Sequence, residues 1–192
     1  MRENIITIFE ESAQVKVRFA RENAEKIADV VQLIAQAFRE GKKVILFGNG
    51  GSAMDASHIA AEFVNRFLME RPPLPALALN TDTAVLTSIS NDYDYSQVFS
   101  KQLAALGQRG DVVIGISTSG NSPNVIKAME TAKKNGMKTV VFTGGSGGTL
   151  AGMADYAFIA PTRATPRIQE THIALGHVIC QLVDEALFGK AG

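Results

Sequence analysis

Two loops rich in glycine and hydroxyl residues carry the strongest chemical signal in the sequence. Residues 48–52 read Gly-Asn-Gly-Gly-Ser and residues 117–122 read Ser-Thr-Ser-Gly-Asn-Ser, and each stretch follows a short apolar run. Glycine lets backbone N–H groups approach an oxyanion, hydroxyls add donors, and the N-terminus of a following helix favours negative charge. Two such loops predict a phosphate site, whereas one alone would equally suit a tight turn with an N-cap. The candidate substrate contacts are Asn49, Gly50, Gly51, Ser52, Ser117, Thr118, Ser119 and Ser122.

The same loops argue against a nucleotide as the ligand. The first loop lacks the GxGxxG spacing of dinucleotide-binding folds because Ala53 stands at its last position. The sequence also contains no GxxxxGK followed by Ser or Thr, which is the pattern of a P-loop. A sugar phosphate therefore fits better than a dinucleotide. A third glycine-rich stretch, residues 144–148, is interpreted as a turn between a strand and a helix.

A second set of residues has the types needed for proton transfer or metal binding. His58 and Glu62 lie four residues apart in a segment with helical spacing, so both side chains point to one face. Gln169 and His177, eight residues apart in a later helix, differ by about 80° and share a broad face, with His172 near the same side. Two imidazoles, a carboxylate and an amide could supply two nitrogens and two oxygens to a divalent ion. A simple hydrogen bond between His58 and Glu62 on a solvated face is the alternative.

Other polar positions have more ordinary interpretations. Residues 91–95 predict a polar loop before a helix, and within it Asn91 and Asp92 are candidates to bind sugar hydroxyls. Capping of the following helix is the alternative role for this loop. Arg66 and Arg71, near the end of an earlier helical segment, are expected to be solvated or interfacial.

The elements that must position these residues alternate along the chain. Short apolar runs that end in small polar loops are typical of buried parallel strands, and helical spacing fills most of the intervals between them. This alternation predicts an α/β fold, a doubly wound five-stranded parallel sheet in the flavodoxin-like order 2-1-3-4-5. In that order the two hydroxyl-rich loops face one crevice. The strands are expected at 44–47, 76–79, 112–116, 139–142 and 156–159, and the helices at 53–69, 96–107, 123–135, 149–153 and 167–188.

The first forty residues predict two further helical segments, which is more than one sheet needs. Their apolar faces would pack on the domain or on another subunit. Because no low-complexity linker and no second core is apparent, residues 1–192 are predicted to form a single domain. Within it, residues 1–40 are expected to act as an N-terminal helical oligomerisation arm.

Composition excludes several classes of protein. Nineteen basic and nineteen acidic residues cancel, so neither a nucleic acid nor an anionic membrane is an expected partner. The only cysteine, Cys180, excludes an intramolecular disulfide and fits a reducing compartment, and its apolar surroundings in the sequence predict core packing. The charged start and the lack of a long apolar run predict no signal peptide and no membrane span, and a cytoplasmic location is expected.

These motifs together resemble the sugar isomerase (SIS) domain and are closely similar to the bacterial phosphoheptose isomerases. The resemblance covers nearly the whole chain, including the N-terminal helices. It implies a homotetramer built around those helices, with sites near subunit interfaces. It also implies one zinc ion in each subunit, held by His58, Glu62, Gln169 and His177. The resemblance rests on residues 48–52, 58–62, 91–92, 117–122 and 167–170, together with His177.

The resemblance further implies conversion of sedoheptulose 7-phosphate to D-glycero-D-manno-heptose 7-phosphate, an early step toward the heptose of bacterial lipopolysaccharide or another surface glycan. Such an enzyme opens the sugar ring and moves a proton between C1 and C2 through an enediol. Glu62 is the candidate base, His177 is the candidate acid, and Gln169 is a further candidate substrate contact. A carboxylate bound tightly to zinc is a poor base, so whether Glu62 acts as base, ligand or both stays open.

Non-catalytic SIS proteins are the main alternative from another functional class. One such relative binds the initiator of DNA replication and lacks equivalents of Glu62 and His177, which this sequence keeps. A sugar-phosphate sensor would normally carry a DNA-binding or other output module, and none is visible. A sugar-phosphate lyase and a different aldose–ketose pair also stay open.

Overall fold

Five parallel strands form the sheet on which the rest of the chain is built. The computed structural model describes residues 1–189, so the last three residues of the predicted domain, 190–192, lie outside the described residues. The strand order is β2-β1-β3-β4-β5, and every neighbouring pair is parallel. The predicted doubly wound sheet and its order are confirmed. The strands are β1 (Val44–Gly48), β2 (Ala76–Ala78), β3 (Val112–Ile116), β4 (Lys138–Gly144) and β5 (Tyr156–Ala160).

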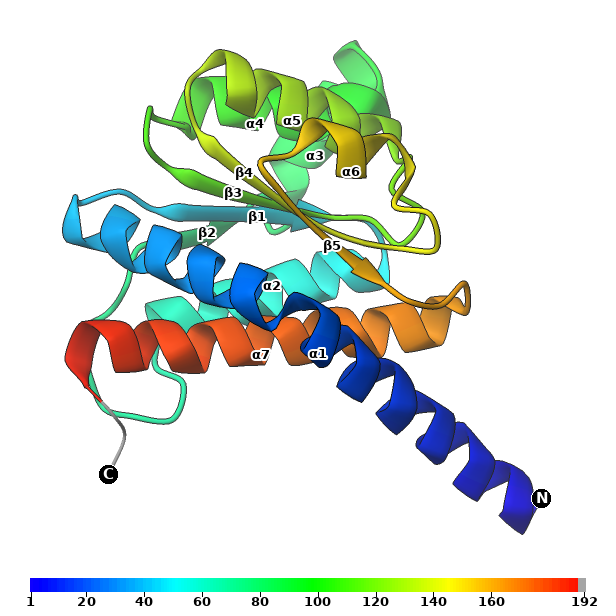
Figure 1. Cartoon of the computed structure of the whole chain (residues 1–192). Coiled ribbons are helices and arrows are strands. Elements are labelled where there is room, and N and C mark those ends of the chain that lie inside the picture. The colour runs from blue at the N-terminus through cyan, green and yellow to red at the C-terminus, as the bar shows by residue number, and fades with distance from the viewer. Residues whose placement is uncertain (190–192) are drawn as a thin grey trace.

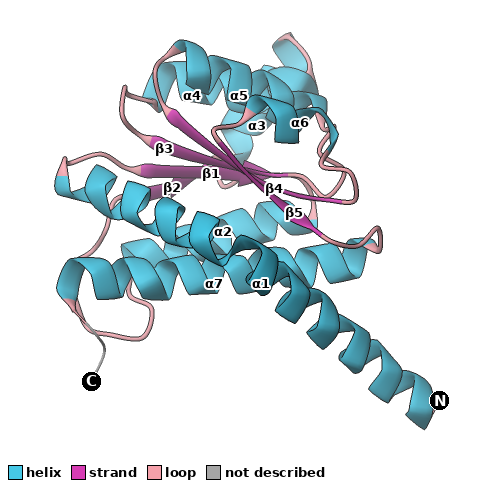
Figure 2. Cartoon of the chain, viewed as in Figure 1, coloured by secondary structure: helices cyan, strands magenta, loops and turns pink. Residues whose placement is uncertain are grey.

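Helices cover both faces of this sheet, as Figures 1 and 2 show. One face carries α1 (Arg2–Arg39), α2 (Gly51–Val64) and α7 (Thr165–Phe188), and the other carries α3 (Thr83–Asp92), α4 (Val98–Leu106), α5 (Pro123–Lys134) and α6 (Gly148–Met153). Strand side chains alternate between the two layers. In β1, Val44 and Leu46 belong to the core under α1, α2 and α7, whereas Ile45 and Phe47 belong to the core under α4 and α5. Because both faces are buried, β1 and β3 are continuously apolar, whereas β4 also contains Lys138, Thr139 and Thr143.

The N-terminal segment is one helix rather than the two predicted segments. No glycine or proline interrupts the 38 residues of α1, so the sequence contains no strong helix breaker. Residues 1–11 are exposed, and this end of α1 projects away from the body of the domain (Figure 1). Two hydrogen bonds join this part of α1 to α7: Arg167 Nη1 donates to the Ile8 carbonyl at 3.1 Å, and the Ser12 hydroxyl donates to Glu170 Oε2 at 2.6 Å. Despite the length of α1, none of the helices in the described chain is apolar enough over a sufficient length to cross a membrane.

The helix α3 differs from the sequence-based prediction. The predicted polar loop at 91–95 is wrong in its first part, because Asn91 and Asp92 form the end of α3. The sequence of α3 is rich in Ser and Thr, which favour turns and caps over helix interiors. The Asp82 carboxylate starts the helix by accepting a hydrogen bond from the Val85 N–H at 3.0 Å. The helix α2 also ends earlier than predicted, at Val64 rather than residue 69.

Candidate functional site

The two hydroxyl-rich loops lie side by side at the carboxyl edge of the sheet. Strands β1 and β3 are neighbours, and Gly48 pairs with Ile116 at the point where both loops begin. The side chain of Asn49 in the first loop exchanges two hydrogen bonds with Asn124 in the first turn of α5, at 2.9 and 2.8 Å. The structure therefore brings the first loop next to the helix that follows the second loop, at the same edge of the sheet, as the strand order predicts.

The second loop concentrates hydroxyl groups in a small volume. The Ser117 hydroxyl lies 2.9 Å from that of Ser122 and 3.4 Å from that of Ser119. Gly120 has φ +67°, and a Cβ there would meet the Gly147 carbonyl at 2.0 Å, so only glycine fits this close approach. A cavity of about 320 Å³ opens beside the loop. Its lining residues are Thr118, Ser119, Gly144, Gly145, Ser146, Arg163, Thr165 and Ile168.

Arg163 is a candidate that sequence reasoning missed. It lies in the short loop between β5 and α7, and it is the only basic residue that lines the cavity beside Ser119. A guanidinium group is well suited to a phosphate. A lone arginine in a loop carries no local signal, so only the folded chain reveals its position.

The first loop is buried at its two ends, whereas Gly50 and Gly51 are exposed. Gly50 has φ +55° and stands just before α2. Ser52 is buried, with 4% of its surface exposed. Gly51 is in contact with Gln169 of α7, since a Cβ on Gly51 would lie 2.3 Å from Gln169 Nε2. The structure thus places Gln169 at the first loop.

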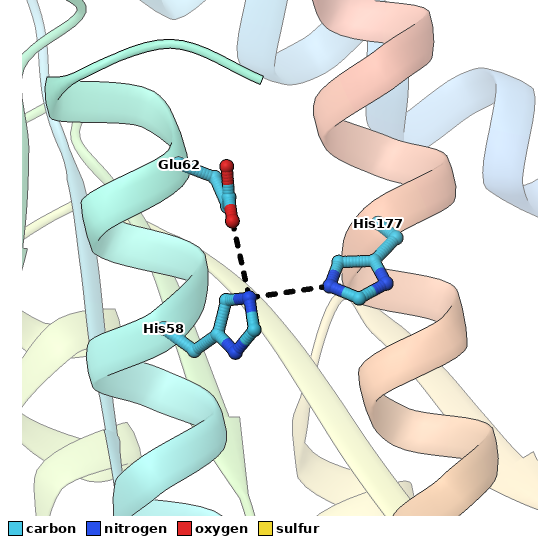
Figure 3. Close-up of side chains that lie close together, drawn as sticks. All are labelled: His58, Glu62 and His177. Carbon is cyan, nitrogen blue, oxygen red and sulfur yellow. Dashed lines mark hydrogen bonds and ion pairs between the residues drawn. The ribbon is translucent and has the colours of Figure 1, made fainter. Parts of the chain in front are cut away.

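Three of the four candidate metal ligands converge between α2 and α7 (Figure 3). His58 Nε2 lies 3.1 Å from Glu62 Oε1 and 3.3 Å from His177 Nε2. One ligand atom from each of the three residues lies within 4.8 Å of the others. The side chain of Glu62 is 23% exposed and that of His58 is 49% exposed, so the cluster faces outward. The ring of Phe67 stacks on His177 with centroids 5.5 Å apart and fixes the plane of that imidazole.

The fourth candidate, Gln169, lies farther along the same helix. It precedes His177 by eight residues, which corresponds to about 12 Å of helix rise. Its side chain rests on Gly51 instead of joining the histidines. Its role as a metal ligand stays a prediction, while its position also suits a contact with substrate.

Two other predicted positions lie away from the cluster. His172 does not share the face of His177: it is 1% exposed and its Nε2 lies 2.9 Å from the Thr143 carbonyl oxygen. Burial lowers the pKa of His172 to about 4, with the Thr143 hydrogen bond acting in the opposite direction, so the ring is neutral at pH 7. Asn91 and Asp92 are exposed at the end of α3, where the Asn91 amide donates to Asp92 Oδ1 at 2.9 Å. Their sugar-binding role stays a prediction.

The two arginines after α2 behave differently from each other. Arg66 is half exposed and 3.5 Å from the exposed Glu70, as expected of a solvated side chain. The same expectation is wrong for Arg71, whose side chain is only 1% exposed and pairs with Asp184 of α7 at 2.9 Å. Cys180 is buried nearby, which confirms core packing, and burial raises the pKa of its thiol well above the ordinary value.

Comparisons with known proteins agree with this arrangement. Residues 8–144 match the family model described as SIS domain. The phosphoheptose isomerase of Thermodesulfovibrio yellowstonii is 60% identical over 188 residues, covering 98% of this chain and 94% of that protein. The phosphoheptose isomerase of Aquifex aeolicus is 55% identical over 185 residues, covering 96% of this chain and 97% of that protein. The solved structure of a phosphoheptose isomerase from Neisseria gonorrhoeae has a TM-score of 0.90 at 42% identity, covering 96% of this chain and 98% of that one.

Proposed function

Because the chain belongs to the phosphoheptose isomerases of the SIS-domain family, we propose that it interconverts sedoheptulose 7-phosphate and D-glycero-D-manno-heptose 7-phosphate. This aldose–ketose isomerisation supplies heptose for bacterial lipopolysaccharide or another surface glycan. The observation that carries the proposal is the convergence of His58, Glu62 and His177 between α2 and α7. A base, an acid and two phosphate-type loops on one domain are what the reaction needs.

The spacing along α2 suits a long, phosphorylated sugar. From Ser52 in the first loop to His58 in the cluster, the helix rises by about 9 Å. A seven-carbon chain whose phosphate is held by the loops would extend its carbonyl end along α2 toward the cluster. Gln169, in contact with Gly51, stands at the start of this path. Binding of the distant phosphate then contributes to the orientation of C1 and C2.

In the ketose-to-aldose direction, Glu62 takes a proton from C1 while an acid protonates the oxygen on C2, which produces an enediol. Glu62 then delivers the proton to C2 while the C1 hydroxyl loses its own proton, so C1 becomes an aldehyde and no atom is gained or lost. His177 serves as the acid that protonates oxygen, including the ring oxygen during ring opening. His58 contacts both Glu62 and His177 and so connects the base to the acid.

The same cluster suits a divalent metal ion, and the proposal includes zinc. Ligand atoms around a tetrahedral zinc ion lie about 3.3 Å apart. The contacts of 3.1 and 3.3 Å that His58 makes in the cluster are close to this spacing. A bound ion would act as a Lewis acid toward the substrate oxygens. Gln169 becomes the fourth ligand only if its side chain turns away from Gly51.

The proposal extends to a homotetramer assembled through α1, with the sites near subunit interfaces. The projecting part of α1 exposes Ile5, Ile8 and Phe9, which have 52%, 47% and 74% of their surface accessible. An apolar surface of this kind is typical of a protein interface. The outward-facing cluster also suits a site that a second subunit covers. The cytoplasmic location and the absence of nucleic-acid and membrane partners stay predictions.

The proposed function is tested by proton NMR of the protein with sedoheptulose 7-phosphate in heavy water, with zinc supplied. We expect a new aldoheptose signal and deuterium beside the carbonyl. Glu62→Gln is expected to abolish both while it keeps the fold and the binding of the sugar phosphate. Glu130→Gln, which changes an exposed carboxylate on α5, is the matched control and is expected to behave as wild type.

Each alternative function gives a different result in the same experiment. Saturable binding without exchange contradicts the isomerase and favours a sugar-phosphate sensor or a non-catalytic SIS protein. Exchange with another sugar phosphate, but not with sedoheptulose 7-phosphate, keeps the enzyme class and changes the substrate. Full activity of Glu62→Gln removes Glu62 as the base.

A further inference from the structure

A buried arginine ties the end of α2 to α7 close to the catalytic cluster. Arg71 Nε donates to Asp184 Oδ1 at 2.9 Å, and both side chains are nearly inaccessible, at 1% and 4%. Its Nη2 donates to the Glu62 carbonyl at 2.9 Å and its Nη1 donates to the Phe63 carbonyl at 2.7 Å. Nη1 also lies within hydrogen-bonding distance of two further carbonyls. One guanidinium group therefore contacts the backbone of the proposed base and a carboxylate on the helix that bears His177.

The chemistry of a helix end explains why an arginine suits this place. The last carbonyls of an α-helix have no partner within the helix, and the same end carries partial negative charge. In α2 these carbonyls belong to the turn that carries Glu62, and the Glu62 and Phe63 carbonyls are directed at Arg71. A guanidinium has five donors in a planar fork, so it can bind these oxygens and Asp184 together. A lysine has only one nitrogen and cannot span them.

The ion pair is poorly arranged for stability alone. Asp184 Oδ2 is buried without a hydrogen-bond partner in the described part of the chain. Burial raises the pKa of Asp184, although the Arg71 hydrogen bond and charge act in the opposite direction. Buried ion pairs often contribute little net stability, because both charges lose their water. A geometric role accounts better for keeping such a pair.

The pair also completes a set of three contacts along α2 and α7. Gly51 contacts Gln169 at the start of α2, Gly176 contacts Ile59 in the middle, and Arg71 joins Asp184 beyond the end of α2. Glu62 and His177 lie between the second and third contacts, and His58 lies next to the second. Loss of the third contact would leave the Glu62 turn free to move relative to His177.

We propose that Arg71, anchored by Asp184, is a positioning residue that holds the Glu62 turn of α2 at the working distance from His177. This inference rests on the proposed function for its kinetic consequence. We call this set of hydrogen bonds from Arg71 to Asp184 and to the backbone of α2 the clamp. The clamp forms without substrate, because all of its partners belong to the chain itself.

The test uses full-length Arg71→Lys, which keeps the positive charge beside Asp184 and removes the fork. Steady-state kinetics with sedoheptulose 7-phosphate are expected to show kcat lower by about 10- to 100-fold, as for a misplaced catalytic group, with KM within about twofold. A second variant, Asp184→Asn, keeps the size of the anchor and is expected to lower kcat in the same direction. Arg39→Lys is the matched control, because Arg39 also donates to a backbone carbonyl of α7, that of Ala186 at 2.8 Å, but joins α1 rather than the Glu62 turn of α2 to that helix.

The three histidines distinguish a local displacement of the cluster from a general loss of packing in the domain. Nitrogen-15 spectra of the imidazoles are expected to show shifted signals for His58 and His177 in Arg71→Lys, with the signal of His172 unchanged. His172 is the internal reference, since it is buried against Thr143. A folded Arg71→Lys with wild-type kcat and unmoved signals overturns the proposal. Movement of all three signals together also overturns it, because it indicates a structural role only.

Failure of the proposed function is distinguishable from failure of this inference. If the wild type does not turn over sedoheptulose 7-phosphate, the histidine signals alone decide about the clamp. Selective movement of the His58 and His177 signals then supports it, and unmoved signals overturn it. If Arg71→Lys does not fold, Asp184→Asn is judged by the same spectra and the same criteria.

Discussion

Gly176 of α7 lies so close to Ile59 of α2 that a Cβ at position 176 would come within 2.4 Å of Ile59 Cδ1. His177 follows Gly176 and His58 precedes Ile59, so this contact sets the separation of the two imidazoles. Ile59 is 1% exposed and packed in the core, which leaves it little room to move. The absence of a side chain at position 176 is therefore part of the construction of the site.

Substitution of Gly176 by alanine is expected to force α7 away from α2. Overpacking of this kind costs about 1–3 kcal/mol of unfolding free energy. We expect urea denaturation to show that loss and kinetics to show a lower kcat/KM. Gly152→Ala on α6 is the control, because a Cβ at Gly152 meets nothing within 4 Å. This variant is expected to keep the wild-type kcat/KM and to have an unfolding free energy equal to or slightly above that of the wild type.

A second substitution tests the same contact from the other helix. Ile59→Val removes the Cδ1 atom that the new Cβ would approach most closely. In the Gly176→Ala background it is expected to restore part of the lost stability and part of the activity. A double variant less active than Gly176→Ala alone would show that the two positions do not interact as described.

Metal binding is expected to depend on the cluster and not on histidines in general. We predict that isothermal titration of the chelator-treated protein detects one zinc ion per chain. His177→Gln is expected to weaken this binding by at least about tenfold, since it removes a ligand. His172→Gln is the control, since His172 lies against Thr143, and it is expected to bind zinc as wild type. Equal weakening in both variants would argue against the His58, Glu62 and His177 site.

The second hydroxyl-rich loop is expected to hold the substrate phosphate. Ser119 is exposed and lines the cavity that also contains Arg163. A hydrogen bond to a charged group contributes about 1.5–3 kcal/mol, so Ser119→Ala is expected to weaken binding of the sugar phosphate by about 10- to 100-fold. Fluorescence or calorimetric titration measures this affinity. Ser88→Ala, which changes an exposed hydroxyl on α3, serves as the control and is expected to bind the sugar phosphate as wild type does. An unchanged affinity in Ser119→Ala would contradict the assignment of the phosphate to this loop.

The buried His172 is expected to make folding stability depend on pH. Burial lowers its pKa to about 4, whereas an unfolded histidine has a pKa of about 6.5. Between these values the unfolded chain binds a proton that the folded chain does not. The contribution of His172 is therefore complete above about pH 6.5 and falls by about 3 kcal/mol as the pH drops to about 4. Urea midpoints across this range measure the effect.

The variant His172→Gln separates this contribution from that of the carboxyl groups. Its side-chain amide can still donate to the Thr143 carbonyl but does not titrate. We expect a shallower dependence on pH between 4 and 6.5 than in the wild type. Equal slopes in the two proteins would contradict the assignment.

Much of the fold follows from local sequence alone. The strands β1 and β3 are continuous apolar runs because both faces of the sheet are covered, and each run leads into a loop of glycine and hydroxyl residues where the chain turns. The neighbouring positions of the two hydroxyl-rich loops then follow from the strand order. The pairing of His58 with Glu62 also follows, because residues four apart in a helix share a face.

Contacts between distant segments were decided only by the tertiary structure. His172 and His177 lie on one helix, but five residues rotate the direction by about 140°. His172 therefore faces β4 while His177 faces α2, and only the packing of α7 shows which is which. Arg71 pairs with the carboxylate of Asp184, which follows it by 113 residues, so no local sequence pattern predicts this pair. Secondary structure depends on the short-range periodicity of the sequence. Whether a charged side chain is buried, and which side of a helix packs on which neighbour, depend on the surfaces that meet when the chain folds.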